Sequence, residues 1–446
     1  MQKTKKSGHR HITSFQIIIL GFLSVILFGS LFLMLPVSAQ SGQVTPFRDA
    51  LFTATSAVCV TGLVIYDTAT YWSAFGQGVI LLLIQIGGMG IVTIFVAVAM
   101  VSGRKIGLMQ RSTMQEAIAA PTVGGIVRRT EFIIKTVVLI ELIGAAFLAP
   151  VFCREFGFFK GIWYSLFHSV SAFCNAGFDL MGVKEPFSSI TSYSAQPIIN
   201  ITIMLLIIVG GIGFLTWEDI KNNKWNFKKY RMQSKVILTV TALLIVFPAL
   251  YFFFFEFSDL PFIKRIWVSL FQSVTPRTAG FNSADLTSIS EVGQMLIIIL
   301  MIIGGSPGST AGGMKTTTLA VLVSSALSVF QKKEHTHFFG RRIPDDTIKH
   351  ASTIFSLYIT LFLTGGMIIS SVEDIPLISA LFETASAIGT VGLSLGITPK
   401  LGAISHFILI CLMFLGRVGG LTLVFAALSE RKPSSSKYPQ EKITVG

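Results

Sequence analysis

The sequence predicts an all-α integral membrane protein, with eight transmembrane helices and four re-entrant pore loops in four pseudo-symmetric helix–pore-loop–helix repeats around one pore. Two observations predict this fold: apolar runs long enough to cross a bilayer, and a short motif that recurs four times between them. Of the 446 residues, 52% are hydrophobic and 13% are charged. A soluble domain carries about twice that charged fraction.

The apolar runs predict helices near 15–36, 71–101, 133–152, 195–217, 236–255, 291–330, 350–372 and 402–428. Each is long enough for a spanning helix, which needs about 20 apolar residues. The first run is too long for a signal peptide and lacks a small-residue cleavage site, so we expect it to be retained. Glu141 interrupts the third run, and the sixth is too long for one span, so we expect that helix to be broken.

The charge pattern predicts the topology. The net charge is +13, and most Lys and Arg residues lie in the segments 1–14, 103–135, 218–235, 331–350 and 430–446. The positive-inside rule then places both termini in the cytoplasm of a multi-pass plasma-membrane protein. Membrane topology accounts for the positions of the basic residues. The sequence contains no separate domain that could bind nucleic acid. The expected division is an N-terminus 1–14, repeats 15–101, 133–217, 236–330 and 350–428, cytosolic loops 102–132, 218–235 and 331–349, and a tail 429–446.

The repeated motif is a Leu-Phe pair, then Ser or Thr, then small residues, then a glycine. The four glycines are Gly62, Gly177, Gly280 and Gly392, which follow the motif phenylalanine by 10, 10, 9 and 10 residues. Paired glycines follow in the next apolar run, at Gly87-Gly88, Gly210-Gly211, Gly304-Gly305 and Gly419-Gly420, although Gly416 fits the fourth spacing slightly better. Each motif is too short and polar to span, so it must enter and leave the membrane by one face, where its backbone needs protein or water around it.

These motifs have the composition of an ion-selectivity filter. Backbone carbonyls that replace the hydration shell of K⁺ require backbone angles that glycine supplies at low cost. The candidate carbonyl segments are Val60-Thr61-Gly62, Asn175-Ala176-Gly177, Thr278-Ala279-Gly280 and Thr390-Val391-Gly392, the last of which reads as the Thr-Val-Gly of a potassium-channel filter. Short helices are expected to run toward these glycines from about Phe47, Trp163, Trp267 and Pro376. The alternative is that the glycines only permit close helix packing.

A glycine-rich segment interrupts the sixth apolar run. It comprises Gly304, Gly305, Ser306, Pro307, Gly308, Ser309, Thr310, Ala311, Gly312, Gly313, Met314, Lys315, Thr316 and Thr317. Five glycines and a proline cannot continue a regular helix, so we expect an irregular loop below the filter that gates conduction. One alternative is a simple helix kink. A Walker A loop is the other, and it fails because Met314 stands where lysine is required.

Several charged residues fall at membrane depth or beside the filters. Arg417 lies in the eighth run, and we expect it to bind carbonyls of the 304–317 loop and to repel cations when the gate is shut, the alternative being a purely structural arginine. For Lys315 two alternatives remain: a functional role similar to that of Arg417, or a side chain that snorkels to the membrane interface. For Glu141 we expect pairing with a neighbouring helix. Four acids near the filters either concentrate cations or form a solvated surface: Asp67, Asp179, Asp285 and Glu383.

Taken together, the four motifs, the single glycine per filter, the broken sixth helix and Arg417 resemble the Trk/Ktr/HKT superfamily of potassium transporters. The length and the eight helices are most similar to its KtrB-type membrane subunits, over about residues 12–430. The resemblance implies a homodimer with one pore per subunit, on a cytosolic ring of KtrA-like subunits that bind ATP and ADP or NAD(H). It further implies sodium stimulation, potassium selectivity linked to Gly62, and gating by the intramembrane loop with Arg417.

The expected function is therefore potassium uptake through a channel-like pore, with K⁺ bound at the filter carbonyls, Na⁺ as a candidate activator and no organic cofactor in this chain. An alternating-access cation transporter is the competing hypothesis, because such proteins also contain broken helices and repeats. Those repeats are usually two and inverted, whereas four motifs here share one orientation. A membrane enzyme would need clustered His or carboxylate side chains at membrane depth, and the sequence offers no such cluster.

Overall fold

The computed structural model describes residues 13–94, 102, 107–118, 122, 124–419 and 441. Residues 1–12 of the predicted N-terminus 1–14, the ends of the second and eighth helices, parts of the 102–132 loop and almost all of the 429–446 tail lie outside the described residues, as does Gly420. The described chain is helical apart from its loops and one two-stranded hairpin.

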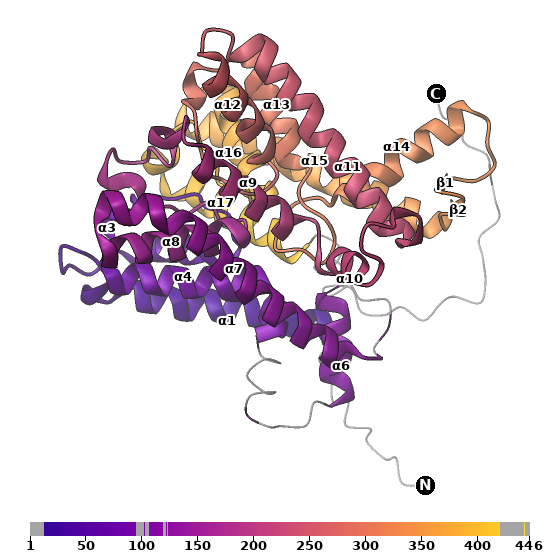
Figure 1. Ribbon diagram of the computed structural model, residues 1–446, viewed down its shortest axis with the longest axis horizontal. Coiled ribbons are helices and arrows are strands. Elements are labelled where there is room, and N and C mark those ends of the chain that lie inside the picture. The colour runs from indigo at the N-terminus through magenta and orange to yellow at the C-terminus, as the bar shows by residue number, and fades with distance from the viewer. Residues whose placement is uncertain are drawn as a thin grey trace.

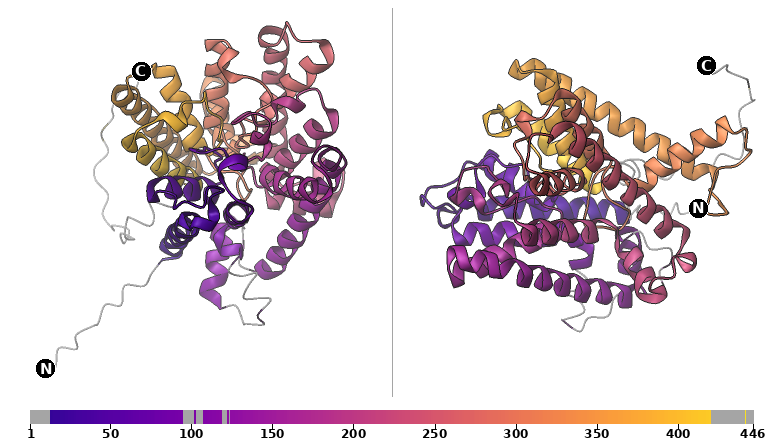
Figure 2. Two further views of the ribbon diagram at one scale, coloured as in Figure 1. Left: turned by 90° about the vertical axis from the view of Figure 1, so that its left-hand side faces the viewer. Right: turned by 45° about the horizontal axis from the view of Figure 1, so that its top comes forward.

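Each repeat consists of an outer helix, a pore helix and an inner helix. In chain order these are α1 (Ser14–Met34), α2 (Phe47–Val58) and α4 (Ala74–Met89); α7 (Ile126–Phe156), α8 (Phe158–Phe173) and α9 (Pro197–Gly211); α11 (Met232–Tyr251), α12 (Phe262–Val274) and α13 (Glu291–Ile302); and α15 (Asp345–Glu373), α16 (Leu377–Gly389) and α17 (Ala403–Val418). The repeats follow one another around a common centre, as the colour order in Figure 2 (left) shows. This arrangement confirms the predicted all-α fold with four repeats around one centre.

Further elements join these helices. The segments that connect the end of one inner helix to the next outer helix contain α6 (Leu108–Ala117), α10 (Phe214–Asn223), η4 (Phe227–Lys229), α14 (Thr316–Phe330), β1 (His337–Phe338) and β2 (Arg341–Arg342). The outer loops contain η1 (Pro36–Ser38), α3 (Thr68–Tyr71), η2 (Met181–Val183), η3 (Thr191–Tyr193), the π-helix η5 (Phe252–Glu256), η6 (Leu286–Ser288) and η7 (Thr398–Lys400). Figure 1 shows α14 and the hairpin projecting from the helix bundle.

The outer helices are the long, continuous spans. Among the described residues, four helices pass the length and composition test for a membrane span: Ser14–Met34, Ile126–Phe156, Met232–Glu256 and Asp345–Glu373. The third predicted helix extends beyond its expected range at both ends, and Glu141 lies within it without interrupting it. Its carboxylate accepts hydrogen bonds of 3.0 and 3.2 Å from Gln85 Nε2 on α4, which confirms the expected pairing with a neighbouring helix.

The inner helices, in contrast, are interrupted. The break expected in 291–330 is confirmed, since α13 ends at Ile302 and α14 begins at Thr316. A continuous helix over 195–217 is wrong, because α10 turns away from α9 by 97°. Gly213 sits at the turn with φ +91°, and the next amide, that of Phe214, donates to Gly308 O at 2.7 Å. The glycine-rich loop thus binds the backbone that the bend exposes.

The pore helices are the most deeply buried elements. The four motif phenylalanines are fully buried: Phe52, Phe167, Phe271 and Phe382. Two of the helices, α8 and α12, begin five residues before the expected Trp163 and Trp267, while α2 and α16 begin within one residue of expectation. Burial of the recurring motif phenylalanine therefore fixes each pore helix, whose C-terminal end leads into the filter segment.

Candidate functional site

The four candidate filter segments share one unusual backbone conformation. The residue two before each glycine is in the left-handed region, with φ of +57° at Val60, +59° at Asn175, +69° at Thr278 and +51° at Thr390. The glycines follow with φ of +92° at Gly62, +68° at Gly177, +79° at Gly280 and +95° at Gly392. β-Branched residues rarely adopt this region, and such strain persists only where surrounding structure imposes it. The repeat seen in the sequence is thus a repeat of backbone geometry.

The glycines close into a ring. A β-carbon on Gly62 would lie 2.5 Å from Ala176 O, and one on Gly177 would lie 2.7 Å from Ala279 O. In the same way, a β-carbon on Gly280 would collide with Val391 O, and one on Gly392 with Thr61 O. Each repeat therefore packs its glycine against the carbonyl of the next repeat, in the order one, two, three, four, one.

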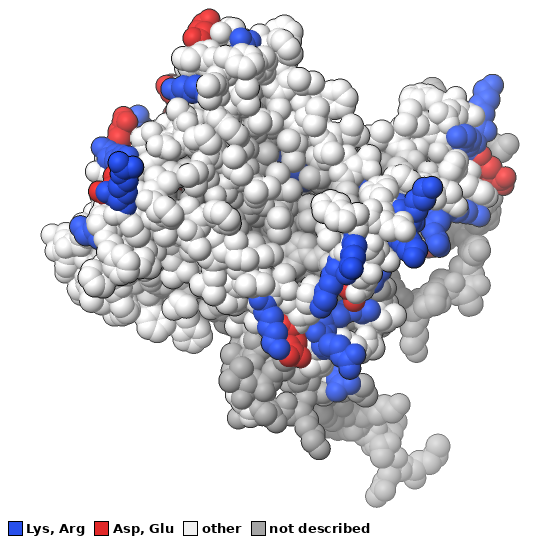
Figure 3. Space-filling model, in the orientation of Figure 1, with Lys and Arg blue, Asp and Glu red and all other residues white. Residues whose placement is uncertain are grey.

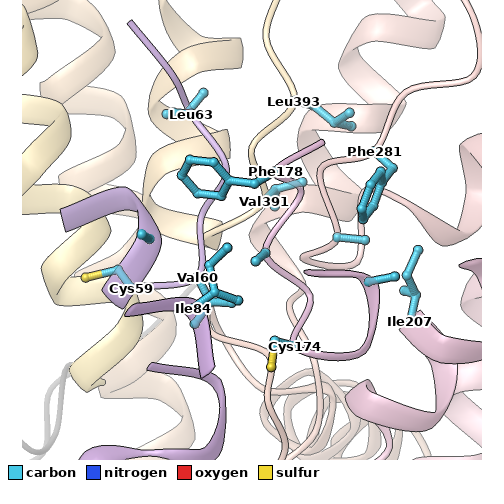
Figure 4. Packing of buried hydrophobic residues seen from close by; sticks show 14 of the residues in the cluster. Cys59, Val60, Leu63, Ile84, Cys174, Phe178, Ile207, Phe281, Val391 and Leu393 are labelled. Carbon is cyan, nitrogen blue, oxygen red and sulfur yellow. The ribbon is translucent and has the colours of Figure 1, made fainter. Parts of the chain in front are cut away.

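An outer cavity of about 300 Å³ opens directly above this ring. All four glycines line it, together with residues that follow them in the chain, including Leu63, Phe178 and Leu393. Figure 4 shows Leu63, Phe178, Phe281 and Leu393, one from each repeat, in the same region, with Val391 beside Phe178 and Val60 lower in the view. The four filter segments, far apart in the sequence, form one site.

Backbone carbonyls of serine and threonine residues near the ends of the pore helices anchor the filter strands. The carbonyls of Ser56, Ser171 and Ser386 accept the amides of Thr61, Ala176 and Val391, each at 2.8 Å, and Thr275 O accepts the amide of Ala279 at 3.0 Å. Sequence reasoning noted these positions as part of the motif but assigned them no role. The signal was the hydroxyl that recurs six residues before three of the glycines and five before Gly280, the repeat with the shorter spacing.

The paired glycines of the inner helices serve close packing. A β-carbon on Gly87, Gly210 or Gly416 would collide with Val58 O, Phe173 O or Ile388 O, each four residues before the filter glycine. The fourth repeat therefore uses Gly416 at this position. The expected pair Gly419-Gly420 is offset, and Gly419 instead ends α17 with φ +89°.

The 304–317 loop lies between the inner helices and is bonded to two neighbouring repeats. Ser306 N donates to Gly211 O at 3.0 Å, and Thr310 Oγ1 donates to Phe173 O at 3.1 Å, both in the second repeat. Gly313 N donates to Gly416 O in the fourth repeat at 3.1 Å.

The loop also touches the filter, since a β-carbon on Gly312 would collide with the Thr390 hydroxyl. That hydroxyl is buried and has no hydrogen-bond partner within the described part of the chain. The filter and the loop are therefore in direct contact.

Arg417 connects this loop to the first repeat. Its guanidinium donates to Thr310 O and to Gly87 O, and at 3.1 Å to Gly88 O. The expected contact between Arg417 and the loop carbonyls is therefore present. Lys315 does not snorkel outward: Nζ folds back onto Ala311 O at 2.8 Å and Gly312 O at 3.2 Å. Two cations thus neutralise carbonyl dipoles of an irregular segment at membrane depth.

The acids near the filters anchor loops. Asp67 is buried and accepts the amides of Ala69, Thr70 and Phe187, each at 3.0 Å. Buried Glu383 accepts hydrogen bonds from Ser394, Leu395 and Thr398. The solvated-surface alternative is wrong for these two residues. Asp179, which lines the outer cavity, accepts Met181 N, and exposed Asp285 caps η6.

The fold and the site define a membrane protein of the four-repeat type, in which pore loops converge on one axis above an intramembrane loop. The chain belongs to the TrkH family of cation transport proteins, whose family model matches residues 2–438. This membership confirms the resemblance drawn from the four motifs, and the family is one of transporters, not of enzymes.

Curated relatives and a solved structure agree with this assignment. The chain is 42% identical to the potassium/sodium uptake protein NtpJ of Enterococcus hirae, over 99% of both chains. It is 38% identical to the Ktr system potassium uptake protein B of Bacillus subtilis over the full length of both. The crystal structure of the potassium transporter TrkH from Vibrio parahaemolyticus matches with a TM-score of 0.73 at 20% identity, covering 96% of this chain and 87% of that one.

The close packing of the inner helix α4 against the first filter loop predicts different effects for two glycine-to-alanine substitutions on α4. Gly87→Ala forces a β-carbon against Val58 O, whereas nothing lies within 4 Å of a β-carbon on Gly78. We expect Gly87→Ala to destabilise the protein by about 1–3 kcal/mol, the usual cost of overpacking. Gly78→Ala should be neutral or slightly stabilising, because alanine favours helices over glycine.

Thermal unfolding of the two purified variants in detergent measures the difference. Equal unfolding temperatures for Gly87→Ala and Gly78→Ala would contradict the contact between α4 and the first filter loop.

Proposed function

We propose that this chain takes up potassium ions across the plasma membrane through a channel-like pore whose filter is the ring of carbonyls around Gly62, Gly177, Gly280 and Gly392. The observation that carries the proposal is the closure of that ring, in which each glycine packs on the next repeat's carbonyl. The printed names of the relatives, which specify potassium or potassium and sodium uptake, support the choice of ion.

The proposed chemistry is dehydration of K⁺ by backbone oxygens. The carbonyls of Thr61, Ala176, Ala279 and Val391 lie in the ring, one from each repeat. Carbonyl dipoles of this kind replace the hydration shell of the ion. The C-terminal ends of the four pore helices point toward the same place and add partial negative charge that favours a cation.

The gate in this proposal is the 304–317 loop, held shut by Arg417. The loop carries the backbone contacts described above on the cytosolic side of the filter, and Arg417 ties it to the first repeat. An alternating-access mechanism fits less well, since such transporters are usually built from two inverted halves that rock around a central site. Four repeats in one orientation, closed into a ring, favour a fixed filter with a moving loop.

We further propose that the chain acts as a homodimer under a cytosolic, nucleotide-binding ring of KtrA-like subunits, with Na⁺ as an activator and both termini in the cytoplasm. The name of the Bacillus subtilis relative, which places it in a Ktr system, supports a multi-subunit assembly. Figure 3 shows Lys and Arg side chains gathered at the end of the molecule where α10 and the β1–β2 hairpin lie. The basic residues in and beside α10, η4, α11 and β2 are Lys221, Lys224, Lys228, Lys229, Arg231, Lys235, Arg341 and Arg342. This asymmetry favours that end as the cytosolic side.

Gly62→Ser tests the filter. Serine at φ +92° is strained, and its β-carbon displaces Ala176 O from the ring. We expect the ratio of sodium to potassium uptake to rise by about tenfold, equivalent to ~1.4 kcal/mol of lost discrimination. The measurement is ion uptake in cells lacking their own potassium transporters, with the ring subunit co-expressed.

Gly78→Ser is the matched control, because it places the same residue on α4 with open space around it. It should retain wild-type selectivity. Potassium uptake that Gly62→Ser leaves unchanged, or a wild-type chain without potassium uptake, would overturn the filter assignment.

Arg417→Ala tests the gate. The substitution removes the donors to Thr310 O, Gly87 O and Gly88 O, so the loop loses its tie to the first repeat. We expect potassium flux through the membrane subunit alone, reconstituted in liposomes, to rise by about tenfold, since hydrogen bonds to a charged group contribute about 1.5–3 kcal/mol. Arg417→Lys keeps the charge with fewer donors and should be intermediate. Flux at or below wild type in Arg417→Ala would contradict a latching role.

A further inference from the structure

The four filter strands are anchored by two different hydrogen-bond patterns. In the first and fourth repeats, the pore-helix hydroxyl accepts from the filter glycine: Gly62 N donates to Ser56 Oγ and Gly392 N donates to Ser386 Oγ, each at 3.0 Å. These bonds hold the glycine amides and leave the next carbonyl untouched.

In the second and third repeats, the equivalent hydroxyl acts as a donor instead. Ser171 Oγ donates to Phe178 O at 2.7 Å, and Thr275 Oγ1 donates to Phe281 O at 2.5 Å. Ser171 and Thr275 are both buried at the ends of their pore helices. Their backbone carbonyls accept hydrogen bonds from the filter amides of Ala176 and Ala279. The carbonyls of Phe178 and Phe281 therefore point back into the protein.

The residues that follow the glycines divide in the same way. They are Leu63 and Leu393 in the first and fourth repeats, and Phe178 and Phe281 in the second and third. Within the described residues, no hydrogen bond ends on the carbonyl of Leu63 or Leu393. The two free carbonyls sit on neighbouring repeats, because Gly392 packs against Thr61 O in the ring.

We propose that the outermost cation site of the filter is built from two repeats only, with Leu63 O and Leu393 O as its protein ligands, while Ser171 and Thr275 withhold the other two carbonyls. This inference rests on the proposed function of the ring as a potassium filter. It assigns Ser171 and Thr275 as positioning residues that set the coordination of the entering ion.

The consequence is an asymmetric entry site. Two carbonyls on one side cannot replace a full hydration shell, so the entering cation keeps water on the side of the second and third repeats. The outer cavity has space for that water, at about 300 Å³, and it contacts the glycines of all four repeats. Full dehydration then occurs one level deeper, where every repeat contributes a carbonyl. Because such an outer site binds the cation weakly, the cation can enter the filter from it, or return to the outer solution, rapidly.

Thr275→Val tests the assignment, because valine has nearly the shape of threonine but cannot donate to Phe281 O. The freed carbonyl adds a third ligand to the outer site, so the KM for potassium uptake should fall about threefold or more, and inhibition by Rb⁺ and Cs⁺ relative to K⁺ should change. Thr275→Ser retains the hydroxyl and should restore the wild-type KM and competition ratios. The assay is concentration-dependent potassium uptake with the ring subunit present.

Ser171→Ala provides an independent second variant, since it frees Phe178 O without adding bulk, and it should shift KM in the same direction. An unchanged or raised KM in both hydroxyl-deletion variants, or Thr275→Ser behaving like Thr275→Val, overturns the two-repeat site. Those results do not contradict the assignment of the ring as a potassium filter, provided that the wild type transports potassium. If the wild type does not transport potassium, the proposed function itself is contradicted, independently of the two-repeat site.

Discussion

The structure depends on one steric constraint: at the filter, each repeat approaches its neighbour so closely that only hydrogen fits at the glycine. The carbonyl of Ala176 lies where a β-carbon of Gly62 would be, and the same relation repeats around the ring. Cyclic packing of this kind fixes the four strands relative to one another, and a hydrogen bond of 3.1 Å between the side chains of Asn175 and Thr278 also joins the second strand to the third. It also brings four carbonyls to one level, which is the requirement for replacing a hydration shell.

The same constraint extends downward through the inner helices. Gly87, Gly210 and Gly416 let three inner helices touch the backbone just below the filter, and these helices then end or bend at positive-φ glycines. The third inner helix breaks into the 304–317 loop, which occupies the space that the others leave. Because the loop contacts Thr390 above and Arg417 beside it, the filter and the proposed gate share one packed unit.

Much of this organisation was predictable from the sequence, for identifiable physical reasons. Apolar runs and the fourfold motif predicted the repeats, the pore helices and the break near Gly304, because burial and membrane thickness act on patterns that the sequence displays directly. The intramembrane position of Arg417 predicted its contact with a carbonyl of the loop, at Thr310, but not its hydrogen bonds to Gly87 O and Gly88 O of α4.

Other features needed the three-dimensional structure. The bend at Gly213 depends on Gly308, almost a hundred residues away, and no local pattern distinguishes it from a continuous helix. The buried, loop-anchoring roles of Asp67 and Glu383 arise from folded outer segments. Whether a motif hydroxyl donates or accepts is seen only in the folded filter strands, although the Leu or Phe after each glycine divides the repeats in the same way.

The most direct test of the central claim is to locate the ion in crystals of the membrane subunit grown with Rb⁺ or Tl⁺, using anomalous scattering. We predict a peak on the axis of the ring, level with the carbonyls of Thr61, Ala176, Ala279 and Val391. A transport-competent protein that shows no peak on this axis, or peaks only away from the ring, would contradict the account.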